Sequence, residues 1–235
     1  MVAVRAGRHL VRTSAGLLRA QRLHGPPDRA RVALVGQTAL LLGGDRVELE
    51  VELGPLSVLE LSDIAGTVAY HGRGQPASWH TAIRLGPGAR LSYAGQPLVV
   101  SDGADVTRTL TVDLAEGASA RLRETLVLGR WGERGGCLDA SSVLRRSGME
   151  FCRERLLLDR DARGRPGVLA GVRIVDSVLE LRAPSPEVVA APDRATDACQ
   201  SSFSTRGDVA TYALLDEGST LTRFLGASLA DSPLG

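Results

Sequence analysis

The chain has 235 residues, with 28 basic side chains against 27 acidic ones and a formal net charge of +1. Every basic residue is an arginine, because the sequence contains no lysine, and aromatic residues make up only 3% of it. The balanced charge and the scarcity of rings argue against broad binding of nucleic acid or anionic membranes, which needs a basic stripe or rings on which bases stack. No apolar stretch approaches the ~20 residues that span a bilayer.

The first 18 residues carry arginines but no continuous apolar segment behind them, which does not fit a secretory signal peptide. The three cysteines, Cys137, Cys152 and Cys199, are widely spaced and odd in number, so they fit neither a disulfide framework nor a zinc site. We therefore expect a cytoplasmic protein that forms one domain over residues 1–235.

Alternation with a period of two residues dominates the pattern of apolar side chains. In residues 46–53, valine and leucine alternate with charged residues, and residues 106–114 repeat the pattern with threonines on the other face. Residues 120–128 continue it more weakly. Because successive side chains of a strand point to opposite faces, these segments are predicted to be half-buried strands.

Glycine turns separate the predicted strands at Gly54, Gly88, Gly117 and Gly218. Each glycine follows the end of one strand and precedes the next, as in a hairpin where glycine supplies a positive φ. The spacing is too irregular for a strict solenoid. The pattern predicts stacked hairpins that build an extended, sandwich-like, mainly β body.

Helical signal is scarce. Residues 186–199 have a helix-like composition that Pro192 interrupts, and residues 222–229 could form one short helix. The predicted fold is therefore mainly β, with one or two short helices towards the C-terminus.

Familiar catalytic motifs are missing from the sequence, which has no G-x-S-x-G, no G-x-x-x-x-G-K-[ST] and no H-E-x-x-H. A phosphate-binding loop needs a lysine that this chain lacks. His71 and His80 flank a glycine-rich turn and could meet across a hairpin, but a histidine pair without carboxylate or thiolate company is a weak metal site.

Two carboxylates stand at positions whose parity points inward. Alternation places Glu124 on the same face as Leu126, and Glu154 on the apolar face of its own segment. A buried carboxylate costs several kcal/mol unless it is paired, hydrated or coordinated. Two interpretations stay open: an ion pair with a neighbouring arginine, Arg123 or Arg153, or a hydrated internal passage for a transient divalent cation.

Seven short segments follow one another in an order that is informative as a set. They are Gly-Leu-Leu at 16–18, Leu-Leu-Gly-Gly-Asp at 41–45, Ala-Gly-Thr-Val-Ala-Tyr at 65–70, residues 85–93, residues 96–104, Glu124 followed five positions on by Gly129-Arg130, and Glu-Arg-Leu-Leu-Leu at 154–158. Together they resemble the urease accessory protein UreD family, also called UreH. The resemblance covers residues 12–225.

This resemblance implies a β-rich, sandwich-like fold with two helices and a non-enzymatic role in urease maturation. Proteins of the family scaffold a complex with UreF and the GTPase UreG, which docks on apo-urease. The resemblance further implies that nickel passes in transit through an internal channel, with no tightly bound cofactor. Glu124 and Glu154 match acidic positions of the family that line this channel, and Asp45 is a weaker candidate.

Two alternatives come from other classes of protein. A β-sandwich module that binds a ligand, without a role in metal delivery, is expected to show an exposed platform of three coplanar rings. A hydrolase on a β-helical scaffold, with Asp63, Asp102 or Glu124 as acid and base, needs two carboxylates about 5–5.5 Å apart if it retains configuration.

Overall fold

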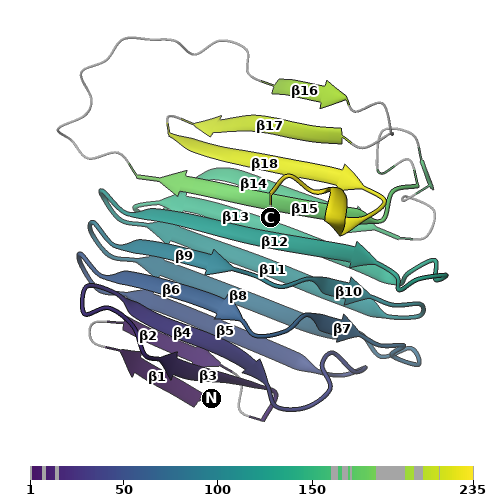
Figure 1. Cartoon of the computed structure of the whole chain (residues 1–235), viewed down its shortest axis with the longest axis horizontal. Helices are drawn as coiled ribbons and strands as arrows, with labels where there is room; N and C mark the ends of the chain where they lie inside the picture. Colours follow the sequence, from purple (N-terminus) through teal and green to yellow (C-terminus); the bar gives the residue numbers. More distant parts are fainter. Residues whose placement is uncertain are drawn as a thin grey trace.

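The chain folds into two long β-sheets that pack face to face, and successive segments of the chain stack from the N-terminal to the C-terminal end (Figure 1). The computed structural model describes residues 2–6, 9–13, 16–159, 164–165, 169, 171–183, 199–203, 209–216 and 218–234. The prediction of a mainly β, stacked, sandwich-like body is confirmed.

Sheet A has seven strands in the order β1-β2-β5-β8-β11-β13-β14. They are β1 (Val2–Ala6), β2 (His9–Thr13), β5 (Arg46–Leu53), β8 (Ala77–Leu85), β11 (Asp105–Leu114), β13 (Cys137–Arg146) and β14 (Met149–Leu158). The four central strands β5, β8, β11 and β13 are parallel, whereas β14 runs antiparallel to β13.

Sheet B has eleven strands, nine of them in the order β16-β17-β18-β15-β12-β9-β6-β4-β3. They are β3 (Leu18–Leu23), β4 (Ala30–Gly36), β6 (Val58–Asp63), β9 (Arg90–Ala94), β12 (Ser119–Leu128), β15 (Ile174–Arg182), β16 (Cys199–Phe203), β17 (Val209–Asp216) and β18 (Ser219–Gly226). The short strands β7 (Thr67–Ala69) and β10 (Leu98–Val100) pair with each other, and β10 also pairs with β12.

Three of the four glycine turns are arches between the sheets, so the prediction of hairpins is wrong there. The turns at Gly54, Gly88 and Gly117 join β5 to β6, β8 to β9 and β11 to β12, yet each strand pairs with the next copy in its own sheet. Both strands of each arch carry an apolar face, and these faces meet across the core. At Gly218 the hairpin is confirmed, because β17 and β18 pair antiparallel.

The arches stack directly on one another through backbone hydrogen bonds. Leu56 N donates to Pro87 O at 2.8 Å, and Gly88 N donates to Glu116 O at 2.9 Å. This stacking keeps the inward positions of consecutive strands in register. The resulting core is built mainly from leucine, valine and alanine, with Trp79 and Tyr93 as buried rings.

The short helices predicted towards the C-terminus are not found in the residues described there. Residues 222–226 belong to β18, which pairs with β15 and β17, and only the 3-10 helix η2 (Leu229–Asp231) follows. Pairing on both sides of β18 and burial of Phe224 favour the strand over a helix. Residues 186–198 lie outside the described residues. No helix within the described ranges is long and apolar enough to cross a membrane.

The C-terminal tail is fastened to the outer face of sheet B by a buried carboxylate. Ser232 Oγ donates to Asp176 Oδ2 at 2.6 Å, and Thr125 Oγ1 donates to Asp176 Oδ1 at 2.8 Å. The Asp176 side chain is fully buried and forms an ion pair with Arg123 at 2.9 Å. Burial alone would raise the pKa of Asp176, but these donors outweigh it and lower the pKa.

Stacking of the arches predicts that Gly86→Ala destabilises the fold. A Cβ at Gly86 would lie 2.9 Å from the Leu53 carbonyl oxygen, which belongs to the preceding arch. We expect a loss of roughly 1–3 kcal/mol in the free energy of unfolding, typical of overpacking, measured by urea denaturation. Gly36→Ala is the control, because its Cβ would meet only ordinary contacts at 3.5 Å and beyond. Equal stability of the two variants would contradict close stacking.

Candidate functional site

A polar cavity lies between the two sheets in the C-terminal half of the stack. Its volume is about 280 Å³. It is lined by Thr81, Arg108, Leu110, Ser142, Leu144, Cys152, Arg153 and Glu154 from sheet A, and by Tyr93, Leu122, Arg123, Glu124, Ser177, Leu179, Leu215, Leu221 and Arg223 from sheet B. Both carboxylates singled out from the sequence, Glu124 and Glu154, line this space, which we call the Glu154 cavity.

Glu124 forms an ion pair that crosses the interior. Its carboxylate on β12 of sheet B accepts a hydrogen bond from Nε of Arg108 on β11 of sheet A. The Arg108 guanidinium also lies over the ring of Trp79, 5.6 Å from its centroid. Burial disfavours the charged guanidinium, but Glu124, Tyr93 and Asp63 together outweigh this effect, and the pKa of Arg108 is raised.

Glu154 forms a second cross-sheet pair with the opposite polarity. Its two oxygens on β14 of sheet A accept hydrogen bonds from Nη1 and Nη2 of Arg223 on β18 of sheet B, at 2.6 and 2.8 Å. Arg223 Nε donates to Ser177 Oγ at 2.9 Å. The Glu154 side chain keeps 35% of its surface exposed, so the cavity reaches solvent on this side.

The predicted inward orientation of both glutamates is confirmed, but the arginines named as partners are wrong. Arg123 pairs with Asp176, and Arg153 pairs with Glu150 on its own strand at 2.6 Å. Strand alternation explains the difference: Arg123 and Arg153 border the cavity, but they are adjacent in sequence to the glutamates, so their guanidinium groups project to the other face of each sheet.

A second cavity, of about 260 Å³, lies towards the N-terminal half of the stack. We call it the Tyr70 cavity. Its lining consists of Leu18, Leu34, Val35, Gly36, Thr38, Ala39, Leu40, Asp63, Ile64, Ala65, Gly66, Thr67, Val68, Tyr70 and Trp79. Ile64 is 60% exposed and Tyr70 38% exposed, so this cavity opens to solvent beside them.

Asp63 and Tyr93 join the linings of the two cavities. Tyr93 lines the Glu154 cavity and donates its hydroxyl hydrogen to Asp63 Oδ1 at 3.0 Å, while Asp63 lines the Tyr70 cavity. Gln96 N donates to the other oxygen of Asp63, also at 3.0 Å. Burial raises the pKa of Asp63, and the two hydrogen bonds and nearby Arg108 offset only part of that effect.

Asp45, the weaker candidate from the sequence, lies in a turn outside both cavity linings. Its Oδ2 accepts a hydrogen bond from Leu42 N at 2.7 Å. His71 and His80 also have separate partners: His71 Nδ1 accepts from Arg73 N, and His80 Nδ1 lies 2.8 Å from Thr109 Oγ1. Within the described residues, no three histidine, cysteine, aspartate or glutamate side chains gather to hold a metal ion.

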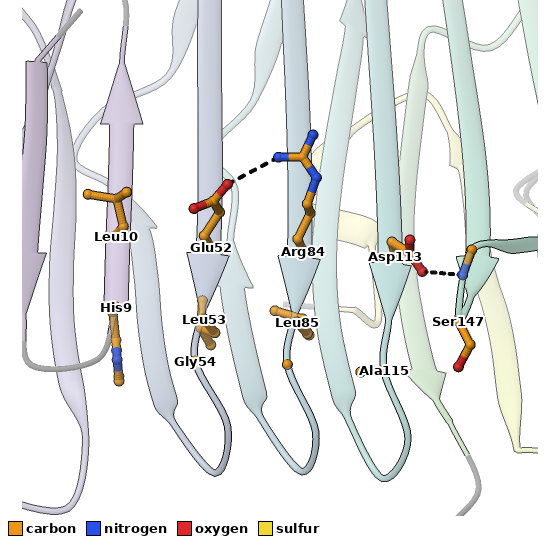
Figure 2. Close-up of a pocket in the computed structure, with 12 residues that line it drawn as sticks. His9, Leu10, Glu52, Leu53, Gly54, Arg84, Leu85, Asp113, Ala115 and Ser147 are labelled. Carbon is orange, nitrogen blue, oxygen red and sulfur yellow. Dashed lines mark hydrogen bonds and ion pairs between the residues drawn. The ribbon is translucent and has the colours of Figure 1, made fainter.

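A groove with a volume of about 700 Å³ runs along the arches at one end of sheet A (Figure 2). Its charged side chains already have partners: Arg84 binds Glu52 at 3.2 Å, and Asp113 accepts from Gly148 N at 3.1 Å. This groove does not contain the carboxylates predicted from the sequence.

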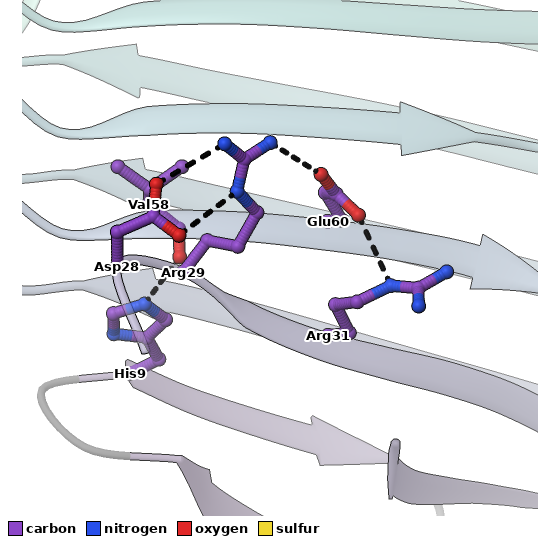
Figure 3. A network of polar contacts seen from close by, with 6 residues as sticks. All are labelled: His9, Asp28, Arg29, Arg31, Val58 and Glu60. Atoms are coloured by element: carbon purple, nitrogen blue, oxygen red, sulfur yellow. Dashed lines mark hydrogen bonds and ion pairs between the residues drawn. The ribbon is translucent and has the colours of Figure 1, made fainter. Parts of the chain in front are cut away.

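A polar network ties the N-terminal end of the stack to its neighbours (Figure 3). His9 Nε2, at the edge of the groove, donates to Val58 O at 2.7 Å. Glu60 accepts from Arg29 at 2.9 Å and from Arg31 at 3.1 Å. The His9–Val58 hydrogen bond joins β2 of sheet A to β6 of sheet B, and the Glu60 contacts tie β6 to β4 and the turn before it within sheet B, so the network is structural.

Arg108 and Arg223, the partners of Glu124 and Glu154, were not predicted from the sequence. A signal for Arg108 existed, because it shares the inward parity of Val106 and Val112, both buried. Arg223 was not identified because residues 222–229 were predicted to form a helix. Residues two apart, such as Leu221 and Arg223, share a face in a strand but not in a helix.

Comparison with known proteins shows one family. The family model described as UreD urease accessory protein matches residues 5–232. "Urease accessory protein UreD 1" of Streptomyces griseus is 46% identical over 186 residues, covering 77% of this chain and 73% of that protein. "Urease accessory protein UreD" of Frankia alni is 34% identical over 227 residues, covering 88% and 75%. "Urease accessory protein UreD 1" of Saccharopolyspora erythraea is 41% identical over 148 residues, covering 62% and only 58%.

The Glu154–Arg223 pair predicts a measurable cost for removing one partner. Glu154→Gln leaves the guanidinium without its counter-charge, and we expect a loss of about 1–2 kcal/mol in unfolding free energy, less than for a fully buried pair because Glu154 is partly exposed. The matched control is Glu150→Gln, whose partner Arg153 is on the surface, with an expected change of about 0.5 kcal/mol or less. In Glu154→Gln/Arg223→Gln, part of the loss is recovered. A double-mutant cycle with no coupling energy between the two substitutions would contradict the ion pair.

The Asp63–Tyr93 hydrogen bond predicts a shift in a side-chain titration. Tyr93→Phe removes a donor that favours the charged carboxylate, so the pKa of Asp63 rises further. Because this pKa is raised above the unfolded value, the contribution of Asp63 to stability is present at acid pH and lost as pH rises through it. Carboxyl ¹³C NMR measures the pKa. Asp139, whose pKa Arg155 lowers, is the internal control and should not move; an unchanged Asp63 would contradict the prediction.

Proposed function

The chain belongs to the UreD urease accessory protein family, and we propose that it acts in urease maturation as a scaffold that delivers nickel to apo-urease in a complex with UreF and the GTPase UreG. The observation that carries this proposal is the family match over residues 5–232, which takes in both cavity carboxylates. Nickel is the cargo in this proposal, not a resident cofactor.

We further propose that the ion travels through the interior, along the Tyr70 and Glu154 cavities. Carboxylates and water are acceptable ligands for Ni²⁺, and an internal space between two sheets shields the ion from competing ligands outside. A conduit must bind its ion weakly enough to release it. Carboxylates that already have arginine partners suit that requirement, because Ni²⁺ must compete with a guanidinium for them.

The roles proposed for this chain and for UreG follow from the residues that this chain contains. A phosphate-binding loop requires a lysine, and the sequence has none, so GTP hydrolysis is assigned to UreG. This chain is accordingly assigned a non-enzymatic part, with urease as the final recipient of the metal.

The ligand-binding module has less support. Among the rings whose side chains are described, Trp79, Tyr93 and Phe224 are buried, Trp131 is 95% exposed and Tyr70 is partly exposed; Phe151 is partly buried against the core, with the Arg146 guanidinium over its ring. That part of the chain therefore offers no platform of three rings. For the hydrolase, Asp102 lies in the turn before β11, where its backbone N–H donates to Glu133, and it lines neither cavity.

The proposal predicts that Glu124→Gln and Glu154→Gln impair urease activation while complexes with UreF and UreG still form. Each substitution keeps the shape of the side chain but removes a charge that attracts the cation. Urease activity is measured after co-expression at limiting nickel, and complex formation by pull-down, with Glu150→Gln as the control. If both variants activated urease at the wild-type nickel requirement, the interior route would be wrong. If the wild-type chain captured neither partner, the scaffold role would be wrong.

A further inference from the structure

Four side chains lie where the linings of the two cavities meet, and we call them the wall. Trp79 and Asp63 line the Tyr70 cavity, and Arg108 and Tyr93 line the Glu154 cavity. Tyr93 donates to Asp63, and the Arg108 guanidinium lies over Trp79. These two side-chain contacts join the linings of two spaces that each reach solvent, and side chains can rotate without disturbing the paired backbone.

A different carboxylate lies on each side of this wall. Asp63 supplies a carboxylate on the side of the Tyr70 cavity, and Glu124 supplies one on the side of the Glu154 cavity. The positive charge of Arg108 lies between them, since it pairs with Glu124 and also acts on Asp63 and Tyr93. A cation that reaches the wall from either side therefore meets one carboxylate and one guanidinium.

We propose that Arg108 is the gate of the interior passage, and that a divalent cation crosses by replacing the guanidinium between Asp63 and Glu124. This inference rests on the proposed function. It adds a third carboxylate, that of Asp63, and a side chain that moves, that of Arg108. With no cation present, Arg108 satisfies Glu124 and keeps the passage closed. When a cation arrives at Asp63, its two positive charges repel Arg108 and attract Glu124.

The ring of Trp79 provides a position for the displaced guanidinium. Arg108 already lies over the indole ring of Trp79, and an arginine over the face of a tryptophan is stabilised by the negative potential of the ring. Trp79 is itself held by a hydrogen bond from its Nε1 to Thr81 Oγ1 at 3.1 Å. A small rotation of Arg108 towards Trp79 frees the Glu124 oxygens while the guanidinium keeps its contact with the ring.

Return of the guanidinium completes the cycle. Once the cation moves on towards Glu154, Arg108 pairs with Glu124 again, and this ion pair lowers the affinity of Glu124 for another cation. The gate therefore disfavours backward movement and prevents tight retention. In this scheme Arg108 sets the residence time of the cation, and Glu124 is the oxygen ligand that Arg108 covers and uncovers.

The decisive variant is Arg108→Gln, studied in the purified chain with Ni²⁺ alone. Removal of the guanidinium leaves Glu124 free to bind the ion, so the affinity for Ni²⁺ measured by equilibrium dialysis is expected to rise roughly tenfold or more. Arg108→Gln/Glu124→Gln should return to the wild-type affinity or below. The control, Arg155→Gln, removes an arginine from an exposed pair with Asp139 outside both cavity linings and should leave the affinity unchanged. Wild-type affinity in Arg108→Gln would overturn the gate.

A measurement on the wild-type chain keeps the test open if Arg108→Gln does not fold. Paramagnetic Ni²⁺ should broaden the carboxyl ¹³C signals of Asp63 and Glu124 together, and more strongly than that of the surface residue Glu52. Broadening of neither interior signal would overturn the gate.

Urease activation separates the gate from the proposed function. If Arg108→Gln retains nickel more tightly and activates urease poorly, both stand. If it binds nickel more tightly but activation is insensitive to Arg108, Glu124 and Asp63 alike, Arg108 still controls a cation site, and the interior route to urease fails.

Discussion

Two ion pairs of opposite polarity join the sheets through the core, and the rest of the interior is arranged around them. Arg108 reaches from sheet A to Glu124 of sheet B, and Glu154 reaches from sheet A to Arg223 of sheet B. A charge taken out of water must be paired, because desolvation otherwise costs several kcal/mol. The apolar sandwich can therefore contain the two glutamates because each has its own arginine, and Asp63, Tyr93 and Trp79 adjoin the Arg108–Glu124 pair.

The arches are what bring the first pair together. Strands that face each other across an arch place residues equally far from the turn opposite one another, and Arg108 and Glu124 lie on either side of the turn at Gly117. The same geometry stacks β5, β8 and β11 in parallel register, so that Trp79, Thr81 and Arg108 share the inner face of sheet A. A hairpin would have paired the two backbones and left no interior between them. The polar space is thus a direct consequence of connections that cross between the sheets.

Parity was sufficient to find the two glutamates, and it could have found Arg108, because strand alternation depends only on local sequence. The Glu154–Arg223 pair is different: 69 positions separate its members, and they meet only because β14, the edge strand of sheet A, lies across the core from β18 of sheet B. No local pattern carries that information. The short helix expected at 222–229 failed for the same reason, since it is the pairing of β18 with β15 and β17 that makes this segment a strand. Asp63 likewise gains its setting from Tyr93, on a neighbouring strand of sheet B.

The pairing of each carboxylate bears on how an ion could move through such a space. A bare carboxylate cluster between two sheets would bind a divalent cation tightly, because the surroundings screen its charge poorly, and it would also destabilise the empty protein. An arginine beside each of the two glutamates reduces both problems: each pair is neutral when no cation is bound, and the cation gains only the difference between its own attraction and that of the guanidinium it replaces. That difference can be small even where each attraction is large. A passage lined by ion pairs can therefore be both stable when empty and weak enough to release its cargo, which a cage of histidine or cysteine ligands cannot be.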